Sequence, residues 1–189
     1  MLNTALQVLS KDGSIADNTY QVIGEDGVLP QGDVVLTVEQ LDQLAQVSGK
    51  KALLVTVDAS PETHEFPLDQ LDAIFIDFAG FNDGRGYSFA ALLRRQGFQG
   101  ELRATGDVFK DVLNYMKRSG FDTFVIKEGK DILEAAAGLN DFRNPYQAST
   151  AVALNFQVNK KLDFGSAFLY LYAAFLMHKL KKKKQVDWT

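Results

Sequence analysis

Aspartate, arginine and serine are grouped in one short run of this chain, Phe81-Asn82-Asp83-Gly84-Arg85-Gly86-Tyr87-Ser88. The run lies between an apolar segment, residues 73–78, and a helical pattern, residues 88–96. The pattern therefore predicts a strand, a glycine-flanked arginine loop and a helix in succession. Such a junction brings a guanidinium and the free N–H groups of a helix start together, which suits a carboxylate or a phosphate. We take the run as a candidate site for a small anion or for a partner.

Two interpretations of this loop stay open at the level of sequence. In the first, Arg85 clamps a small oxyanion and Ser88 adds a donor at the helix start. In the second, the two glycines form a tight turn, Ser88 caps the helix, and Arg85 pairs with Asp83 or Asp107. A dinucleotide fingerprint is excluded, because Phe89 stands where its third glycine is required.

Two further loops are expected beside this one. Thr105-Gly106-Asp107 and residues 127–131 each follow a predicted strand, and the carboxyl ends of parallel strands meet at one edge of a sheet. Asp107 is the candidate acid or base there, although it also suits a simple helix start. Arg103 lies within a strand and, if buried, needs a carboxylate such as Asp77. The candidate site therefore consists of Asp107 as the catalytic group and of Asp83, Arg85, Tyr87, Ser88 and Arg103 as anion- or partner-binding residues.

Strands and helices alternate along the middle of the chain, which predicts parallel βαβ units. An N-terminal hairpin over residues 6–22 is predicted from the Asp-Gly turn signal at residues 12–13. We therefore predict an α/β fold with a mostly parallel sheet of about four strands, open or a partial barrel, since a closed barrel needs about 250 residues. The expected strands are residues 52–57, 73–78, 101–104 and 121–126, and the expected helices are residues 38–47, 88–96, 108–119 and 132–138.

Composition sets limits on the chemistry. The chain has 189 residues, of which 46% are hydrophobic and 23% charged, enough for one domain with a core. It contains no cysteine, which excludes disulfides, thiolate nucleophiles and thiolate-held iron–sulfur or zinc sites. His64 and His178 show no metal-ligand spacing, so no metal site is predicted. We expect a cytoplasmic location, because the N-terminus lacks a secretory pattern. The spacing of four further residues predicts that they pack in the core: Tyr115, Met116, Phe121 and Phe124.

Charge is divided unevenly along the chain. Residues 151–189 hold seven lysines against Asp163 and Asp187, a net charge of +5. Since the whole chain carries −4, the first 150 residues carry −9. A body this acidic does not suit a phosphate backbone, so we expect no nucleic-acid partner.

A change of character after Gln147 divides the chain into a predicted α/β domain, residues 1–147, and an extension, residues 148–189. Residues 164–177 are 14 uncharged residues, and the predicted apolar helix 164–178 precedes a lysine-rich end. Such a helix spans about 21 Å, short of the roughly 30 Å hydrocarbon core, which disfavours a membrane span. Packing against the domain or a second subunit and contact with a membrane surface stay open.

The stretch from Asp72 to Gln147 resembles the bacterial domain of unknown function 934 family. Together with a compatible hairpin and Gly32-Asp33-Val34, the likeness extends over the first 147 of the 189 residues. The motifs that carry it are Phe81, Asp83-Gly84-Arg85-Gly86-Tyr87-Ser88, Leu92-Leu93-Arg94, Gly100-Glu101-Leu102-Arg103-Ala104, Gly106-Asp107-Val108, Gly120-Phe121-Asp122, Asp141-Phe142 and Tyr146-Gln147.

The resemblance implies an accessory protein of assimilatory sulfite reduction, since family members are described as oxidoreductases of that process and their genes neighbour the sulfite reductase hemoprotein. One expectation is an oxidoreductase component that binds a small anion at residues 83–88. The alternative is a non-enzymatic interaction or scaffold module for the sulfite reductase, with the extension as a dimer, partner or membrane-surface contact. The family implies no particular cofactor, so whether the chain is an enzyme stays open.

Overall fold

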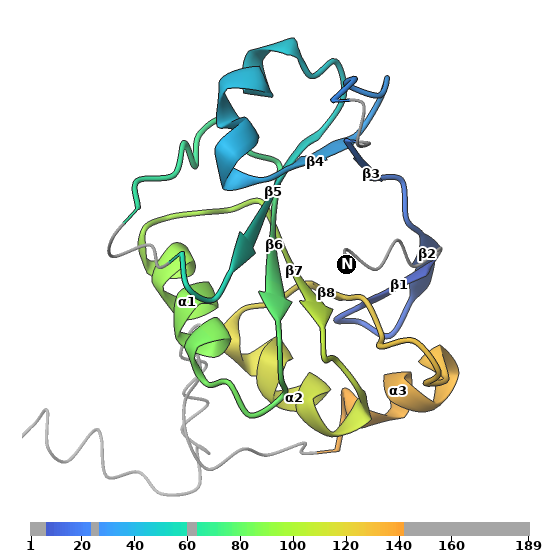
Figure 1. The fold of residues 1–189 in the computed structure, drawn as a ribbon. Coiled ribbons are helices and arrows are strands. Elements are labelled where there is room, and N and C mark those ends of the chain that lie inside the picture. The colour runs from blue at the N-terminus through green and yellow to red at the C-terminus, as the bar shows by residue number, and fades with distance from the viewer. Residues whose placement is uncertain (1–6, 24–26, 60–63, 142–189) are drawn as a thin grey trace, which may run out of the picture. The chain divides into compact units, whose positions relative to one another are not determined.

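The structure is a computed structural model and describes residues 7–23, 27–59 and 64–141. The chain divides into two compact units, residues 1–153 and 154–189, and all described residues belong to the first. The predicted helix 164–178 and Tyr146-Gln147 lie outside the described residues. The elements are β1 Gln7–Ser10, β2 Ile15–Asp17, β3 Gln21–Val22, β4 Val34–Leu36, the 3₁₀ helix η1 Val38–Gln46, β5 Lys51–Thr56, β6 Ala73–Phe78, α1 Arg85–Arg95, β7 Glu101–Gly106, α2 Lys110–Ser119, β8 Thr123–Phe124 and α3 Ile132–Gly138 (Figure 1).

The eight strands of the described residues form one mixed sheet in the order β2-β1-β8-β7-β6-β5-β4-β3. Strands β3 to β8 run parallel, each beside the one before it, whereas β1 pairs antiparallel with both β2 and β8. The α/β class is as expected, but the prediction of a mostly parallel sheet of about four strands is wrong. Strands of two or three residues, such as β3 and β4, are too short for periodicity to reveal. The hairpin also joins the parallel strands, through the pair Leu9 and Phe124.

The sheet curls into a half-barrel because its two edge strands are neighbours in sequence. Strands β2 and β3 lie at opposite edges and are joined only by residues 18–20, which we call the strap. Eight strands laid flat would separate the edges by about 34 Å, at roughly 4.8 Å a strand. The four peptide units between Asp17 and Gln21 span at most about 15 Å. The edges must therefore approach each other, as the curved sheet of Figure 1 shows.

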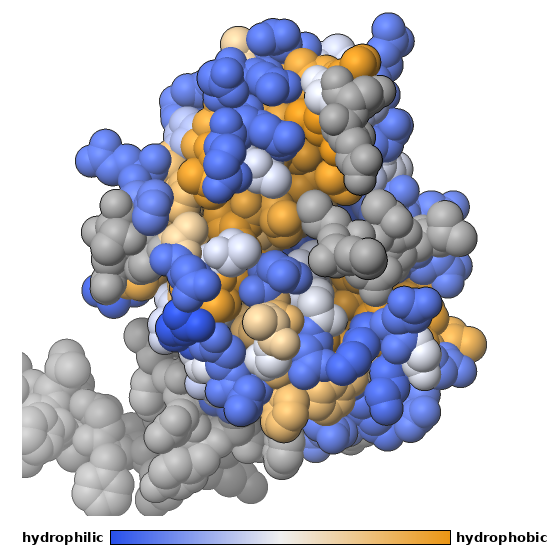
Figure 2. Space-filling view, viewed as in Figure 1, coloured by the Kyte–Doolittle hydropathy of each residue, from blue (hydrophilic) through white to orange (hydrophobic). Residues whose placement is uncertain are grey.

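The main core lies between the convex face of the sheet and the helices. Crossovers between successive parallel strands are right-handed, so η1, α1 and α2 cover the same face. On the face drawn in Figure 2, apolar residues gather over β4 and β5 and hydrophilic residues surround them. The buried cluster includes Leu44 of η1, Leu53 of β5, Ile74 of β6, Phe89 and Leu93 of α1, Leu102 of β7, Leu113 and Met116 of α2, and Phe124 of β8.

The concave face carries a second, smaller cluster. Side chains alternate along a strand, so neighbours of the convex-face residues point to the other side. This cluster consists of Tyr20 from the strap, Val35, Ala52, Ala73 and Phe75, with Leu54 packed against it. The strap therefore packs against the inside of the curled sheet.

The helices occur near the predicted positions. Helix α3 has the predicted bounds, and η1 occupies the expected residues with 3₁₀ geometry. Helix α1 begins at Arg85, three residues before the expected start, and the predicted strand 121–126 is reduced to Thr123–Phe124. Among the described residues, no helix has the length and apolar character needed to cross a membrane.

Candidate functional site

Three loops meet at the carboxyl ends of β6, β7 and β8, as expected for parallel strands. The Asp107 carboxylate accepts the backbone N–H of Phe81 at 3.0 Å and the ammonium of Lys127 at 2.6 Å. Each of these residues follows a different strand, so one carboxylate holds three loops together. We call this region the carboxyl-end edge; it consists of Asp58, Phe81, Asp83, Arg85, Asp107 and Lys127.

Arg85 is held by two carboxylates at this edge. Its Nε lies 3.0 Å from Asp83 Oδ1 and its Nη2 lies 2.7 Å from Asp83 Oδ2, while its Nη1 lies 2.5 Å from Asp58 Oδ1. Of the partners considered from sequence, the structure places Asp83 beside Arg85 and Asp107 elsewhere, and it adds Asp58. The Arg85 guanidinium lowers the pKa of the Asp83 carboxyl. An incoming anion would have to compete with both carboxylates for this cation.

Asp83, and not Ser88, serves the start of α1. Helix α1 begins at Arg85, whose N–H donates to Asp83 Oδ1 at 3.1 Å. Ser88 lies inside the first turn, where its N–H faces the Gly84 carbonyl at 3.5 Å. A cation at the first position of a helix opposes the macrodipole, and the Asp83 charge offsets that cost. Arg85 is therefore not placed there to stabilise the helix.

The two glycines of the loop have different roles. Gly86 is buried against Phe78, and a Cβ built on it would lie 2.5 Å from two carbons of that ring. A Cβ on Gly84 would meet nothing within 4 Å, and its φ of −66° suits any residue. The first glycine residue is therefore dispensable for packing, whereas the second allows α1 to approach the sheet closely.

Replacing these glycines should separate their roles. We expect Gly86→Ala to lower the free energy of unfolding by about 1–3 kcal/mol, because the added methyl overpacks against Phe78. Gly84→Ala should stay within about 1 kcal/mol of the original, since a gain in chain stiffness opposes the loss of a good N-cap residue. Urea denaturation of both variants measures the difference, and equal stabilities would contradict the assignment.

Asp107 is a charged anchor at this edge. The Lys127 ammonium, followed by the Phe81 N–H, lowers the pKa of the Asp107 carboxyl below its ordinary 3.8. A carboxyl with this pKa is ionised at neutral pH and holds no proton to donate. The geometry therefore suits an orienting role for Asp107 better than a role as general acid.

The Asp107 titration offers a direct check. We expect the Asp107 pKa to rise toward 3.8 in Lys127→Met, because the ammonium that favours the charged form is gone. A lowered pKa contributes stability that is present above the unfolded-state pKa and is lost as pH falls through the folded-state pKa. Carboxyl ¹³C chemical shifts followed with pH measure this pKa, and an unchanged value in the variant would contradict the ion pair.

Arg103 lies away from the carboxyl-end edge, on the concave face. It is 5% exposed and pairs with Glu101 at 2.7 Å, while its guanidinium carbon lies 4.3 Å from the Phe75 ring centre. The expected partner Asp77 instead accepts a hydrogen bond from Thr105 at 3.1 Å. The register of β6 and β7 explains the difference, because Phe75 lies beside Arg103 and Asp77 lies beside Thr105.

Arg103 also reaches the strap. Its Nη1 donates to Asn18 Oδ1 at 2.8 Å, and the Tyr20 ring centre lies 5.1 Å from the guanidinium carbon. Thr123 of β8 completes the group, because its hydroxyl lies 3.2 Å from Arg103 Nε. Arg103 therefore ties the strap to the middle of the sheet, and the sequence analysis misplaced it because the contact of the strap with the concave face was not predicted.

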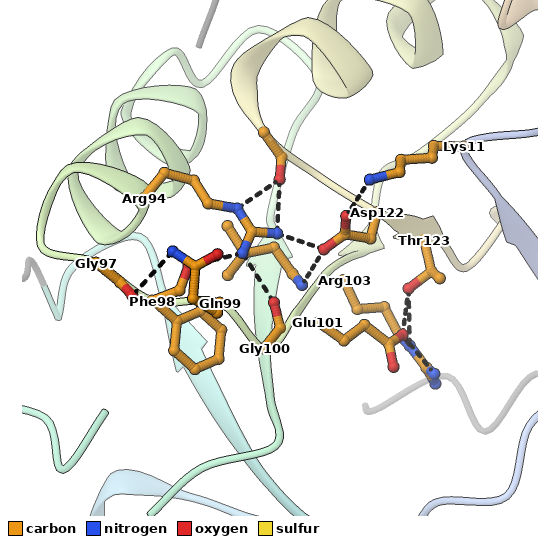
Figure 3. Close-up of polar contacts among 12 residues, drawn as sticks. Lys11, Arg94, Gly97, Phe98, Gln99, Gly100, Glu101, Arg103, Asp122 and Thr123 are labelled. Atoms are coloured by element: carbon orange, nitrogen blue, oxygen red, sulfur yellow. Dashed lines mark hydrogen bonds and ion pairs between the residues drawn. The ribbon is translucent and has the colours of Figure 1, made fainter. Parts of the chain in front are cut away.

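A second arginine network, which sequence reasoning missed, lies at the amino ends of β7 and β8 (Figure 3). Arg94 donates to the carbonyls of Phe98 and Gly100 at 2.8 Å and to that of Gly120 at 3.1 Å, and it also pairs with Asp122. These contacts use all five N–H groups of the guanidinium. The sequence signal was only that Arg94 belongs to the family motifs, without a role attached.

Aromatic rings are exposed beside the carboxyl-end edge. Phe81 is 52% exposed and packs edge-on against Phe109 at 5.4 Å between ring centres, and Tyr115 is 55% exposed and lies 4.7 Å from Tyr87. The prediction that Tyr115 is a core residue is wrong, because helical spacing alone does not separate it from its buried neighbour Met116.

Metal ligation finds no support among the described residues, which hold no group of three or more ligating side chains. Within the same ranges, His64 stacks against Phe66 at 6.2 Å between ring centres.

The fold and the site define an α/β protein with a curled mixed sheet and a charged carboxyl-end edge flanked by exposed aromatic rings. Comparison with protein families gives a match over residues 52–155 to the model described as a bacterial protein of unknown function (DUF934). The match covers more than half of the chain and the whole carboxyl-end edge, so the chain belongs to this family. No curated protein and no solved structure matches the chain.

Proposed function

We propose that this protein is a cytoplasmic accessory protein of assimilatory sulfite reduction that acts by docking to a protein partner through its carboxyl-end edge. The link to sulfite reduction comes from the family resemblance. The proposed partner is the sulfite reductase. The mode of action is argued from the site itself.

The observation that carries the docking role is the state of Arg85. Its side chain is 60% exposed, yet its donors are engaged by Asp83 and Asp58. A guanidinium fixed in this way is poorly suited to capture a small anion but well suited to an interface, where arginine and aromatic residues are enriched. Phe81 supplies the exposed ring beside it.

Rigidity of the edge supports the same proposal. The Asp107 carboxylate holds the loop before α1 in place by accepting the Phe81 N–H. A turn in the same loop is closed by a hydrogen bond of 3.0 Å from the Asp83 N–H to the Gly80 carbonyl. A surface that is ordered before binding loses less conformational entropy when a partner arrives. The edge therefore presents its side chains in a fixed arrangement.

Growth on sulfite tests the proposal in the bacterium that carries the gene. Chromosomal Arg85→Ala and Phe81→Asp should each slow growth on sulfite as the sole sulfur source and leave growth on cysteine unchanged. Exposed ion pairs contribute about 0–1 kcal/mol, so the melting temperature of Arg85→Ala should stay near that of the original protein.

The matched control is Val28→Asp, which places the same charge on another exposed apolar residue, 64% exposed, in the loop between β3 and β4. This strain should grow normally on both sulfur sources. Normal growth of Arg85→Ala and Phe81→Asp on sulfite would contradict the proposed function. Unfolding of Arg85→Ala would show that this arginine is structural.

A further inference from the structure

A groove of about 690 Å³ lies at the amino ends of β7 and β8, at the opposite end of the strands from the carboxyl-end edge. Arg94 and Asp122, whose contacts are drawn in Figure 3, belong to its lining, and the turn of the hairpin and the last turn of α2 each contribute a lysine. A groove of this volume suits a small molecule. We call it the amino-end groove; its lining consists of Lys11, Asp12, Arg94, Gln99, Lys117, Gly120, Phe121 and Asp122.

The carboxylates of this groove already have partners within the protein. Asp122 Oδ1 accepts a hydrogen bond from the Lys11 ammonium at 2.8 Å, and Asp122 Oδ2 pairs with the Arg94 guanidinium. Asp12 Oδ1 accepts both the N–H of Ser14, at 2.9 Å, and the Ser14 hydroxyl, at 2.6 Å. Three of the four carboxylate oxygens in the groove are therefore occupied.

The two ammonium groups, by contrast, keep donors for a ligand. Among the described residues, the Lys117 ammonium has no hydrogen-bond or ion-pair partner, so it can donate all three of its N–H groups. Lys11 is 58% exposed, gives one N–H to Asp122 and keeps two. The groove therefore holds more unused donors than unused carboxylate oxygens, and a ligand that completes it must supply acceptors.

The charge balance of the groove is positive, although the body of the chain is acidic. Three cations and two carboxylates line it. Helices α1 and α2 both end here, and their last turns hold four cations, Arg94, Arg95, Lys117 and Arg118. The carbonyl dipoles of two helix C-termini amount together to about one negative charge, which these cations outweigh. A positive groove on a body of net charge −9 attracts anions to this place in particular.

Two further acids near the amino ends of the strands do not change this balance. Glu101 begins β7 and pairs with Arg103 on the concave face at 2.7 Å. Asp72 precedes β6 and accepts the Lys51 N–H at 2.9 Å. Neither side chain lines the groove.

We propose that the amino-end groove binds a small organic anion that carries two or more negative charges on phosphate or carboxylate oxygens. Lys11, from the hairpin, and Lys117, from α2, donate to these oxygens as compact point charges. Arg94 uses all of its N–H groups within the protein, so it contributes charge and holds the groove in shape but does not contact the ligand. The site is independent of the docking role proposed above, because it lies at the other end of the strands.

Titration of the full-length, ¹⁵N-labelled protein with sodium pyrophosphate at constant ionic strength tests the inference. We expect saturable shifts of the amide signals of Lys11, Gly120 and Asp122, while the Asp107 signal at the carboxyl-end edge stays in place. Acetate, which carries a single charge, should bind at least about tenfold more weakly than pyrophosphate. Uncharged glycerol should cause no saturable shift.

Lysine variants of the full chain locate the binding. Lys117→Gln and Lys11→Gln should each weaken pyrophosphate binding at least about fivefold, because each removes a charged donor. Asp122 keeps Arg94 in Lys11→Gln, so the remaining amide signals should show an intact fold. The matched control is Lys130→Gln, which removes the same charge from the exposed loop after β8 and should leave binding unchanged. The inference is overturned by the absence of saturable shifts, by equal affinity for acetate, or by unchanged affinity in both groove variants.

Discussion

Replacing Arg94 by alanine is expected to destabilise the protein by about 3 kcal/mol, because it removes a partner from one carboxylate and three backbone carbonyls at once. The Arg94 side chain is only 20% exposed, so water replaces few of these bonds. Asp122 would lose one cation and keep Lys11, at 2.8 Å. For a chain of this size we expect the melting temperature to fall by roughly 6–12 °C.

Arg95 is the matched control for this prediction. It is the next residue of α1, carries the same charge and lies exposed on the surface. Arg95→Ala should change the free energy of unfolding by about 0.5 kcal/mol or less. Thermal denaturation of both variants under one set of conditions makes the comparison. Equal melting temperatures would show that the carbonyl contacts of Arg94 contribute no stability.

Replacing Arg103 by methionine should also lower the free energy of unfolding by about 3 kcal/mol, but for a different reason. Methionine keeps most of the aliphatic part of the side chain that packs on Phe75. It leaves the Glu101 carboxylate without its cation and the Asn18 side-chain oxygen without its hydrogen-bond donor. An acid that keeps its charge in a largely buried place after its partner is removed is strongly destabilising. We expect Glu101→Gln in the same chain to restore part of the loss, because the uncompensated charge is then gone.

The strap provides the readout that a general loss of stability would not give. The amide of Gln21 follows the strap and donates to the Asp33 carbonyl at 2.9 Å. If Arg103 ties the strap to the sheet, Arg103→Met should increase the hydrogen-exchange rate of this amide more than the exchange rates of the amides in the central strand β6. Lys50→Met removes an exposed cation and should leave the exchange rates unchanged. Uniform acceleration across the sheet would contradict the tie.

Structural features that depend on residues close together in the sequence could be predicted. The Asp-Gly turn signal predicted the hairpin, whose strands lie within residues 7–17, although residues 21–22 of the predicted range form β3 at the other edge of the sheet. The bounds of α3 were also predicted, at residues 132–138. The carboxyl-end edge could also be predicted, because parallel strands bring the residues after them together. The pair of Arg85 with Asp83 was one of the predicted alternatives, but the pair with Asp58 could not be predicted, since Asp58 lies 27 positions from Arg85 and no spacing rule links them.

Contacts between residues far apart in the sequence escaped prediction altogether. Arg103 meets Asn18 across 85 positions of sequence, and Leu9 pairs with Phe124, which joins the hairpin to β8. The Arg103 contact requires the strap to lie against the concave face of the sheet, whereas the Leu9 contact is a pairing of the neighbouring strands β1 and β8. Three residues between two strands look like an ordinary turn until it is known that the strands lie at opposite edges.

Binding of the purified full-length protein to the sulfite reductase hemoprotein of the same bacterium tests the central claim, docking through the carboxyl-end edge, most directly. We expect binding that weakens at least about tenfold, or about 1.4 kcal/mol, in Phe81→Asp and in Arg85→Ala, and that Val28→Asp leaves unchanged. Absence of binding by the original protein, or equal affinities for all three variants, would contradict the account.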